Sequence, residues 1–125
     1  MPLVVQACPS FESEWHEFLA YWQEESEPPL YAALEGLSRH LIGMLARQDV
    51  SSFPAVFAVI ERWHLEGDAY VKEAATVGLL EDLQNRAAHD TTTPEQFRAY
   101  LGPESAKWWD KVSGFWERGE MLPDD

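Results

Sequence analysis

The sequence predicts an all-α protein of five to six helices arranged in antiparallel hairpins. Three observations predict this class. Hydrophobic residues recur every three to four positions in segments that are separated by proline, glycine and serine. β-Branched residues never alternate over more than a few positions, and no Asn-Gly or Asp-Gly pair marks a β-hairpin. The segment 68–86 is hydrophobic around most of its circumference, which is typical of a buried central helix.

The predicted central helix begins at Asp68, whose carboxylate can cap the free amides of the first turn, and Gly67 ends the preceding segment. Its small residues Ala74, Ala75 and Gly78 allow neighbouring helices to approach closely. The residues expected to be buried are Tyr70, Val71, Ala74, Ala75, Val77, Gly78, Leu79, Leu80 and Leu83. The spacing of Asp68, Val71, Lys72, Ala75 and Leu79 resembles the second helix of a HEAT-type repeat, which makes a HEAT/armadillo-like arrangement the expectation.

Length and composition limit the class of protein. A chain of 125 residues fits one domain, predicted to span 1–125 with a frayed tail at 119–125. The 46% hydrophobic content excludes a disordered chain, and no hydrophobic run approaches the roughly 20 residues that span a bilayer. The single cysteine has no disulfide partner, and the first residues do not read as a signal peptide. We therefore expect a cytoplasmic protein that is monomeric or weakly dimeric.

The net charge of −13 argues against nucleic acid and anionic membranes as partners. A basic protein partner is favoured, because an acidic surface accelerates the encounter with it. Solubility of an aromatic-rich protein explains the same charge equally well.

The first helix is predicted to start at Ser10, its expected N-cap, and to be stopped by Pro28-Pro29. Its hydrophobic stripe is expected to lie in the core and consists of Phe11, Trp15, Phe18, Leu19 and Trp22. Six glutamates lie in the same segment, without a lysine or arginine between them: Glu12, Glu14, Glu17, Glu24, Glu25 and Glu27. This segment is the most negative part of the chain.

Two more helices are predicted before the central one. The second covers residues 30–48, and its Gly36 and Gly43 are expected to mark a close helix crossing, since each glycine costs roughly 1 kcal/mol relative to alanine. The third helix begins after Ser52 and ends at Gly67, so a short loop joins the two as a hairpin.

Two helices are predicted after the central one, beyond a surface loop at 87–93. A short helix starts at Thr93-Pro94, with Phe97, Tyr100 and Leu101 facing inward, and ends before Pro103. Pro103 opens the last helix. Its hydrophobic stripe is expected to cover the core as an aromatic lid and consists of Trp108, Val112, Phe115 and Trp116, with Trp109 one position round.

The sharpest metal-like pattern is Glu61-x-x-His64, the type of pair that occurs in di-iron helical bundles. Such a site needs a second copy of the motif and two further carboxylates, and the chain has no second copy. Glu12 and His16 share a helix face but lack a third ligand at readable spacing. We therefore expect no metal, and we expect His64 to hydrogen-bond a carbonyl near the end of its helix.

Catalytic and cofactor motifs are not found in the sequence. The serines occupy expected caps and helix surfaces, without a G-x-S-x-G turn. P-loop, G-x-G-x-x-G and C-x-x-C patterns are also missing. Neighbouring acids such as Glu81 and Asp82 point about 100° apart on a helix, which favours a solvated face over an acid–base pair. We expect no enzyme, no catalytic residue and no cofactor.

One family resemblance rests on three segments. They are FPAVFAVIER at 53–62 with EGD at 66–68, EAATVGLLEDLQN at 73–85, and LGPES at 101–105. Together they resemble a family of small, uncharacterised bacterial proteins that are all-helical. The resemblance implies similarity to the helical immunity proteins that protect bacteria from secreted toxins, and it implies no catalytic residue.

Three functional hypotheses follow. The first is an immunity-type protein that neutralises a basic toxin domain, and the second is a helical adaptor that holds a peptide or a partner helix. A metal protein or enzyme ranks third. The residues expected to bind the partner are the acids Glu24, Glu25 and Glu27, a second acidic patch at Glu81 and Asp82, and the exposed aromatics Tyr21 and Trp109.

Overall fold

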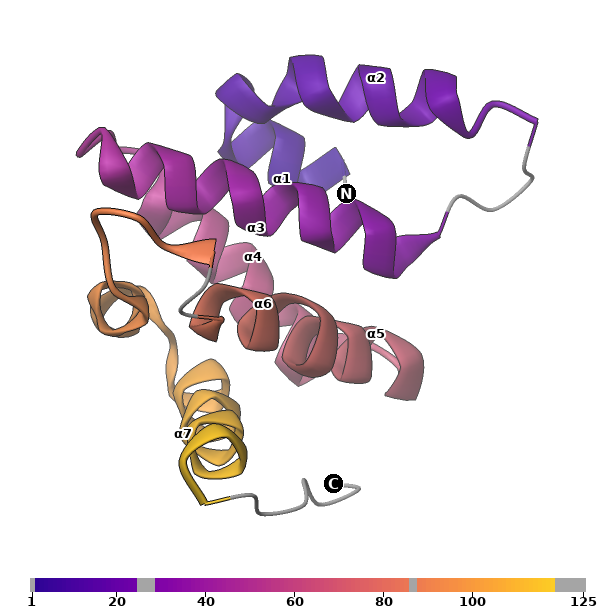
Figure 1. Cartoon of the computed structure of the whole chain (residues 1–125). Helices are drawn as coiled ribbons and strands as arrows, with labels where there is room; N and C mark the ends of the chain where they lie inside the picture. Colours follow the sequence, from indigo (N-terminus) through magenta and orange to yellow (C-terminus); the bar gives the residue numbers. More distant parts are fainter. Residues whose placement is uncertain (1, 25–28, 86–87, 119–125) are drawn as a thin grey trace.

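The computed structural model describes residues 2–24, 29–85 and 88–118, with only the backbone placed for residue 2 and residues 115–118 (Figure 1). This part of the chain is helical and contains no strand, so the all-α class is confirmed. The α-helices are α1 (Pro2–Ala7), α2 (Glu12–Tyr21), α3 (Leu30–Ala46), α4 (Phe53–Glu66), α5 (Ala69–Glu73), α6 (Glu81–Gln84) and α7 (Pro103–Arg118). The 3-10 segments Pro9–Phe11 and Pro94–Tyr100 and the π-helical segment Ala74–Leu80 also lie along the chain.

The central helix begins where the sequence predicts. Asp68 caps it, its Oδ1 accepting a hydrogen bond of 2.9 Å from the backbone N–H of Val71. The helix continues through α5, the π-helical segment and α6 as far as Gln84, and the predicted end at Arg86 lies outside the described residues. The expected helix is thus present but divided, which raises the helix count above the five or six expected.

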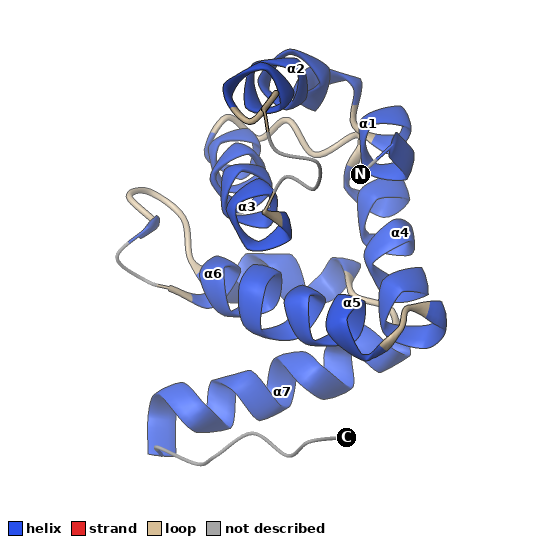
Figure 2. Ribbon diagram, turned by 90° about the vertical axis from the view of Figure 1, so that its right-hand side faces the viewer, coloured by secondary structure: helices blue, strands red, loops and turns tan. Residues whose placement is uncertain are grey.

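The central helix packs between α3 and α7 (Figure 2). Leu79, Leu80 and Leu83 are fully buried, as predicted, whereas Tyr70, predicted to be buried, is 54% exposed. Burial on two sides explains why the helix is hydrophobic around most of its circumference, and Tyr70 lies near its exposed N-terminal end.

The close helix crossing occurs at Gly78. A Cβ atom on Gly78 would lie 3.1 Å from the ring of Tyr31 on α3, so this glycine allows α3 to approach. Gly36 has no atom within 4 Å of such a Cβ, and Gly43 would meet only the end of the Arg47 side chain. The prediction that Gly36 and Gly43 mark a close crossing is therefore wrong.

The other helices extend this core. α4 packs against α1 and α7, and its Phe57 lies in an aromatic cluster with Phe53, Phe97 and Tyr100. The 3-10 segment Pro94–Tyr100 carries the last two rings and starts with a capping box between Thr93 and Gln96, at the predicted position.

The N-terminal segment differs most from the expectation. α1 was not predicted, and its Val4 is buried, while Cys8 after it is buried too. Ser10 does not cap a helix through its side chain; it lies inside the 3-10 segment Pro9–Phe11, and α2 follows directly. Within the described ranges, no helix has the length and hydrophobicity needed to cross a membrane.

Candidate functional site

Helix α2 contains no buried residue. Of the stripe predicted to lie in the core, only Phe11, before the helix, is buried. Trp15, Phe18 and Trp22 are half-buried, Leu19 is exposed, and Tyr21 is 80% exposed. The periodicity correctly places these residues on a helix, but the core prediction is wrong because few residues of the domain pack over that face.

The aromatic side chains of α2 and its end form a continuous row. The rings of Trp15 and Phe18 stack with centroids 5.4 Å apart, and Phe18 lies 6.4 Å from Trp22. Tyr21 meets Trp22 edge-on at 5.1 Å. Because each ring restrains the next, these side chains form a preorganised apolar surface that is only partly covered. We call Trp15, Phe18, Tyr21 and Trp22 the aromatic row.

Acidic side chains border the aromatic row. Glu12, Glu14, Glu17 and Glu24 are all exposed. The two other predicted binding acids, Glu25 and Glu27, lie outside the described residues. Since the sequence between Ser10 and Pro29 contains no lysine or arginine, the acids that the structure describes have no basic neighbour along this segment.

Trp109 cannot serve as an exposed anchor. Its side chain is 3% exposed, and its carbonyl oxygen accepts a hydrogen bond of 2.8 Å from Nε2 of Gln84. The prediction of an exposed Trp109 is wrong because α7 turns this position toward the central helix.

The second predicted patch, Glu81 and Asp82, is half-buried on α6. Burial, together with the nearby carboxylates of Glu35 and Glu81, raises the pKa of Asp82 to about 6, and Arg39 only partly opposes this. Burial also raises the pKa of Glu81. With a pKa of about 6, Asp82 carries less charge near neutral pH than an exposed acid, which weakens this patch as a docking surface for a basic partner.

Replacing Asp82 by asparagine should stabilise the protein at pH 7.5. Folding raises the pKa of Asp82, so the folded protein tolerates the protonated carboxyl better than the charged one. The stability that this group contributes is fully present below its unfolded pKa and is lost as the pH rises through about 6. Solvent screening limits the gain to about 1 kcal/mol. Urea unfolding should show this gain at pH 7.5 and a clearly smaller gain at pH 4.5, which lies between the unfolded and folded pKa values. An equal gain at both pH values, or the same gain for Asp90→Asn at an exposed position, would contradict the assignment.

The Glu61-x-x-His64 pair fastens α7 to α4. The two carboxylate oxygens of Glu61 accept the backbone N–H groups of Glu104 and Ser105 at 2.9 and 2.8 Å, at the start of α7. Partial burial favours the neutral acid, but these hydrogen bonds dominate and hold the pKa of Glu61 below its usual value. Glu61 thus caps α7 from a neighbouring helix.

Both ring nitrogens of His64 are also engaged. Nδ1 lies 3.1 Å from the carbonyl oxygen of Ile60 and 2.9 Å from Oγ of Ser105, while Nε2 lies 3.2 Å from Oγ1 of Thr76. Burial lowers the pKa of His64, so the neutral ring donates from Nδ1 to the carbonyl and accepts at Nε2. The predicted bond to a carbonyl is confirmed. Among the described side chains, no group of three or more His, Cys, Asp and Glu is placed to hold a metal ion.

Replacing Gly102 by alanine should destabilise the protein. The added Cβ would lie 2.4 Å from Cδ of Glu61 and displace the carboxylate that caps α7. Loss of a helix cap costs about 1–2 kcal/mol. Gly36→Ala is the matched control, because open space surrounds that helical position and alanine should add about 0.5–1 kcal/mol there. Urea unfolding measures both, and a Gly102→Ala variant as stable as the parent would show that Glu61 is not needed at α7.

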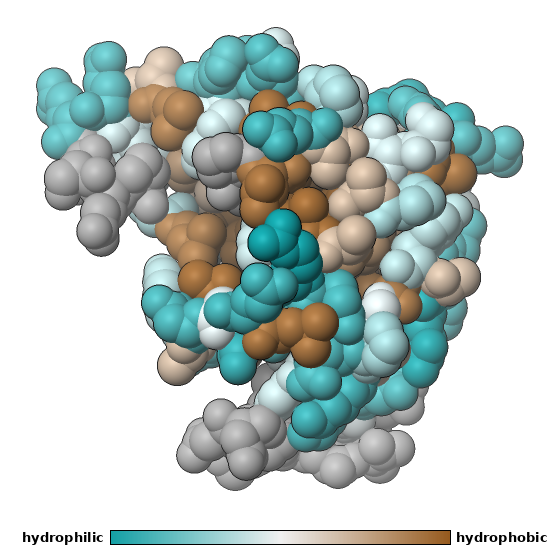
Figure 3. Space-filling model, turned by 180° about the vertical axis from the view of Figure 1, so that it is seen from behind, coloured by the Kyte–Doolittle hydropathy of each residue, from teal (hydrophilic) through white to brown (hydrophobic). Residues whose placement is uncertain are grey.

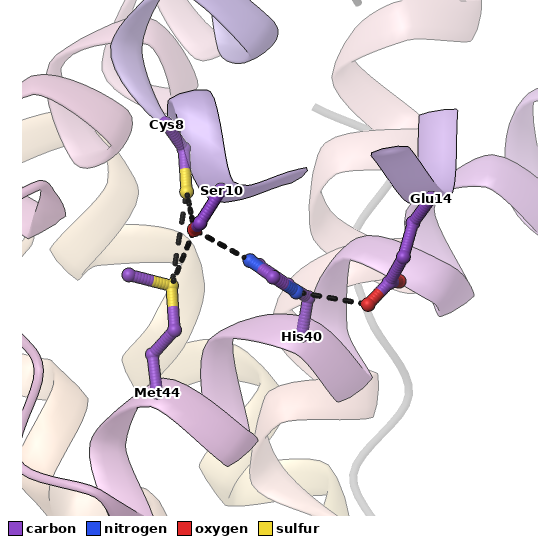
Figure 4. A network of polar contacts seen from close by, with 5 residues as sticks. All are labelled: Cys8, Ser10, Glu14, His40 and Met44. Atoms are coloured by element: carbon purple, nitrogen blue, oxygen red, sulfur yellow. Dashed lines mark hydrogen bonds and ion pairs between the residues drawn. The ribbon is translucent and has the colours of Figure 1, made fainter. Parts of the chain in front are cut away.

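A network missed by the sequence analysis joins α2 to α3 (Figure 4). Oγ of Ser10 lies 2.8 Å from Nε2 of His40, and Nδ1 of the same ring lies 2.9 Å from Oε1 of Glu14. Two sulfur atoms, of Cys8 and Met44, flank Ser10 at 3.4 and 3.7 Å. No local motif could have revealed this arrangement, because His40 follows Ser10 by 30 positions.

The comparison with protein families gives one result. A family model described as a domain of unknown function (DUF7674) matches residues 1–117. The chain belongs to the DUF7674 family. Membership of an uncharacterised family was expected and is confirmed. Comparisons with curated proteins and with solved structures gave no match.

The DUF7674 match includes the aromatic row and the network around His40.

A second surface lies on the face of the molecule seen from behind, which α1 and α4 form (Figures 2 and 3). Hydrophobic residues gather in the middle of that face, and the exposed hydrophobic side chains of the molecule include Leu3 on α1 and Leu65 on α4. Unlike α2, these two helices also bury residues in the core, such as Val4 and Phe57.

Proposed function

We propose that this protein is an interaction module that binds a basic protein domain through α2. The observation that carries the proposal is the aromatic row, which lies on a helix without a buried residue. Aromatic side chains hold large apolar areas, and a contiguous group of them that the domain covers only in part favours a binding surface over a solvated one. A partner that covers the aromatic row would bury apolar surface that the domain itself leaves partly exposed, and this burial would favour binding.

The charges around the row favour a basic partner. Glu12, Glu17 and Glu24 are exposed near it, and the whole protein carries a net charge of −13. Arginine or lysine on the partner could pair with these carboxylates and also stack on the tryptophan rings, a contact worth about 0.5–2 kcal/mol. A phosphate-rich partner would be repelled by the same charges.

The specific form that we propose is an immunity-type protein that neutralises a toxin domain. The resemblance described above and the acidic character of α2 support this form. The alternative is an adaptor that holds a partner helix, which would rest on a HEAT-like stacking of α3, the central helix and α7. The two differ in genetic context, since an immunity gene should lie directly downstream of a toxin gene.

The test uses the toxin domain encoded by the neighbouring gene. The double reversal Glu17→Lys with Glu24→Lys should slow its association at least about tenfold at low salt and leave thermal stability unchanged, because rim charges act mainly on the association rate. Asp49→Lys with Asp90→Lys is the matched control, since it changes the net charge equally at exposed positions away from α2. Replacing Glu24, Glu25 and Glu27 together by lysine should slow association as much as the double reversal Glu17→Lys with Glu24→Lys does.

Two results would refute the proposal. If no neighbouring gene encodes a domain that binds, the immunity form is wrong. If the domain binds but both double reversals slow association equally, the effect comes from net charge and α2 is not the docking surface. The association rate of the parent should decrease as salt is added, and the double reversal Glu17→Lys with Glu24→Lys should weaken this salt dependence.

A further inference from the structure

We propose that Ser10 is a nucleophile for acyl transfer, with His40 as its general base and Glu14 as the residue that positions His40. This inference is independent of the proposed function and is tested without a partner. It rests on the order of contacts from Ser10 to His40 to Glu14, which is the order that serine nucleophiles require.

The hydrogen bonds assign the proton on the imidazole ring. An ionised carboxylate only accepts, so the contact of 2.9 Å between Glu14 and Nδ1 of His40 places the ring proton on Nδ1. In the neutral ring Nε2 then carries a lone pair, and this nitrogen lies 2.8 Å from the hydroxyl of Ser10. The hydroxyl donates to this nitrogen, which is a stronger acceptor than the thioether of Met44 at 3.7 Å. The ring is thus held ready to take the proton of Ser10.

Solvent exposure makes Ser10, and not Cys8, the candidate nucleophile. Cys8 is fully buried, whereas Ser10 is exposed. The His40 side chain is only 10% exposed, which fixes the ring, and that of Glu14 is 50% exposed. The exposure of Ser10 places its hydroxyl at the edge of the network, next to the ordered ring of His40. The competing explanation is that the network only tethers α2 to α3, in which case Ser10 has ordinary serine reactivity.

The chemistry that these residues support is transfer of an acyl group from an activated ester. Oγ of Ser10 bonds to the acyl carbon while Nε2 of His40 takes the hydroxyl proton. The bond from that carbon to the leaving oxygen breaks, and the leaving group departs with the proton from His40. Water then repeats both steps, which releases the carboxylic acid and restores Ser10. Activated esters are the class we assign, because their leaving groups need little further stabilisation.

The probe for this site is a fluorophosphonate, which forms a phosphonate ester with an activated serine and releases fluoride. We expect labelling of the intact protein at Ser10, located by mass spectrometry of its peptide. Ser10→Ala should abolish labelling, and Ser13→Ala, at an exposed serine on α2, should not. His40→Ala should slow labelling about a hundredfold or more, the contribution typical of general-base catalysis, and His16→Ala should not.

Two further measurements separate catalysis from tethering. Glu14→Gln should slow labelling at least tenfold in protein that circular dichroism shows to be folded. Free imidazole should restore labelling in the His40→Ala variant, which a lost tether could not explain. If His40→Ala fails to fold, His40→Gln replaces it, since glutamine can still hydrogen-bond Ser10 but cannot take its proton. Labelling of the parent no faster than that of Ser10→Ala, or unchanged by Glu14→Gln, would overturn the proposal.

Discussion

Replacing Leu79 by aspartate is expected to leave the protein unfolded at room temperature. Leu79 is completely buried in the π-helical segment, where the central helix packs between α3 and α7. An unpaired carboxylate in an apolar site costs several kcal/mol, and domains of this size are stable by only about 5–15 kcal/mol. The lost burial of the leucine side chain adds about 2–3 kcal/mol.

Circular dichroism and thermal unfolding measure this effect. The matched control is Tyr70→Asp, because Tyr70 begins the same helical stretch but is exposed, so its melting temperature should change by only a few degrees. A Leu79→Asp protein that melts cooperatively near the parent temperature would show that the central helix is not the core of the domain. A Tyr70→Asp protein that unfolds would show that the sequence-based placement of Tyr70 in the core was right.

The central helix could be predicted because its signals are local. The Asp68 carboxylate lies within one turn of the Val71 N–H from which it accepts a hydrogen bond. The hydrophobic pattern around the whole helix reflects its packing on two sides. The π-helical segment could not be predicted, because it inserts an extra residue into a turn without changing the composition. Glycine also misleads, since of the three helical glycines Gly36, Gly43 and Gly78 only Gly78 lies at a close crossing, and its neighbour there comes from a distant helix.

The candidate surface was only half predictable. The sequence identifies α2 as an amphipathic helix and locates its acids, and Tyr21 is exposed as expected. Whether the rest of the chain covers an apolar residue depends on the tertiary arrangement, so Trp15, inside a hydrophobic stripe, and Trp109, one position away from one, led to opposite errors. Trp15 was expected in the core and is only half-buried, while Trp109 was expected at the surface and is buried.

The network around His40 was beyond prediction for a different reason. Ser10 has the local signature of an N-cap, since it follows a proline and precedes acids, and that signature competes with any other role. Its actual partner lies on α3, and only the packing of α2 along α3 brings the two together. Contacts of this kind depend on the fold, so residue type and spacing contain no trace of them.

The second large effect separates core aromatics from the aromatic row. Phe57→Ala should lower the free energy of unfolding by about 3–5 kcal/mol, because the ring is buried and its removal leaves a cavity. The cavity would open between Phe53, Phe97 and Tyr100, whose ring centroids lie 5.8, 5.9 and 6.0 Å from that of Phe57. Urea unfolding with an unchanged m-value would measure this loss.

The matched variant is Phe18→Ala on α2. This ring is half-buried and lies against the rings of Trp15 and Trp22, so its removal should cost much less than removal of Phe57, about 1 kcal/mol. If α2 is the docking surface, the same substitution should weaken partner binding at least tenfold, since aromatic anchors at the centre of an interface contribute most of its affinity. A Phe18→Ala variant as destabilised as Phe57→Ala would place the aromatic row in the core, where it would stabilise the fold and leave no surface for a partner.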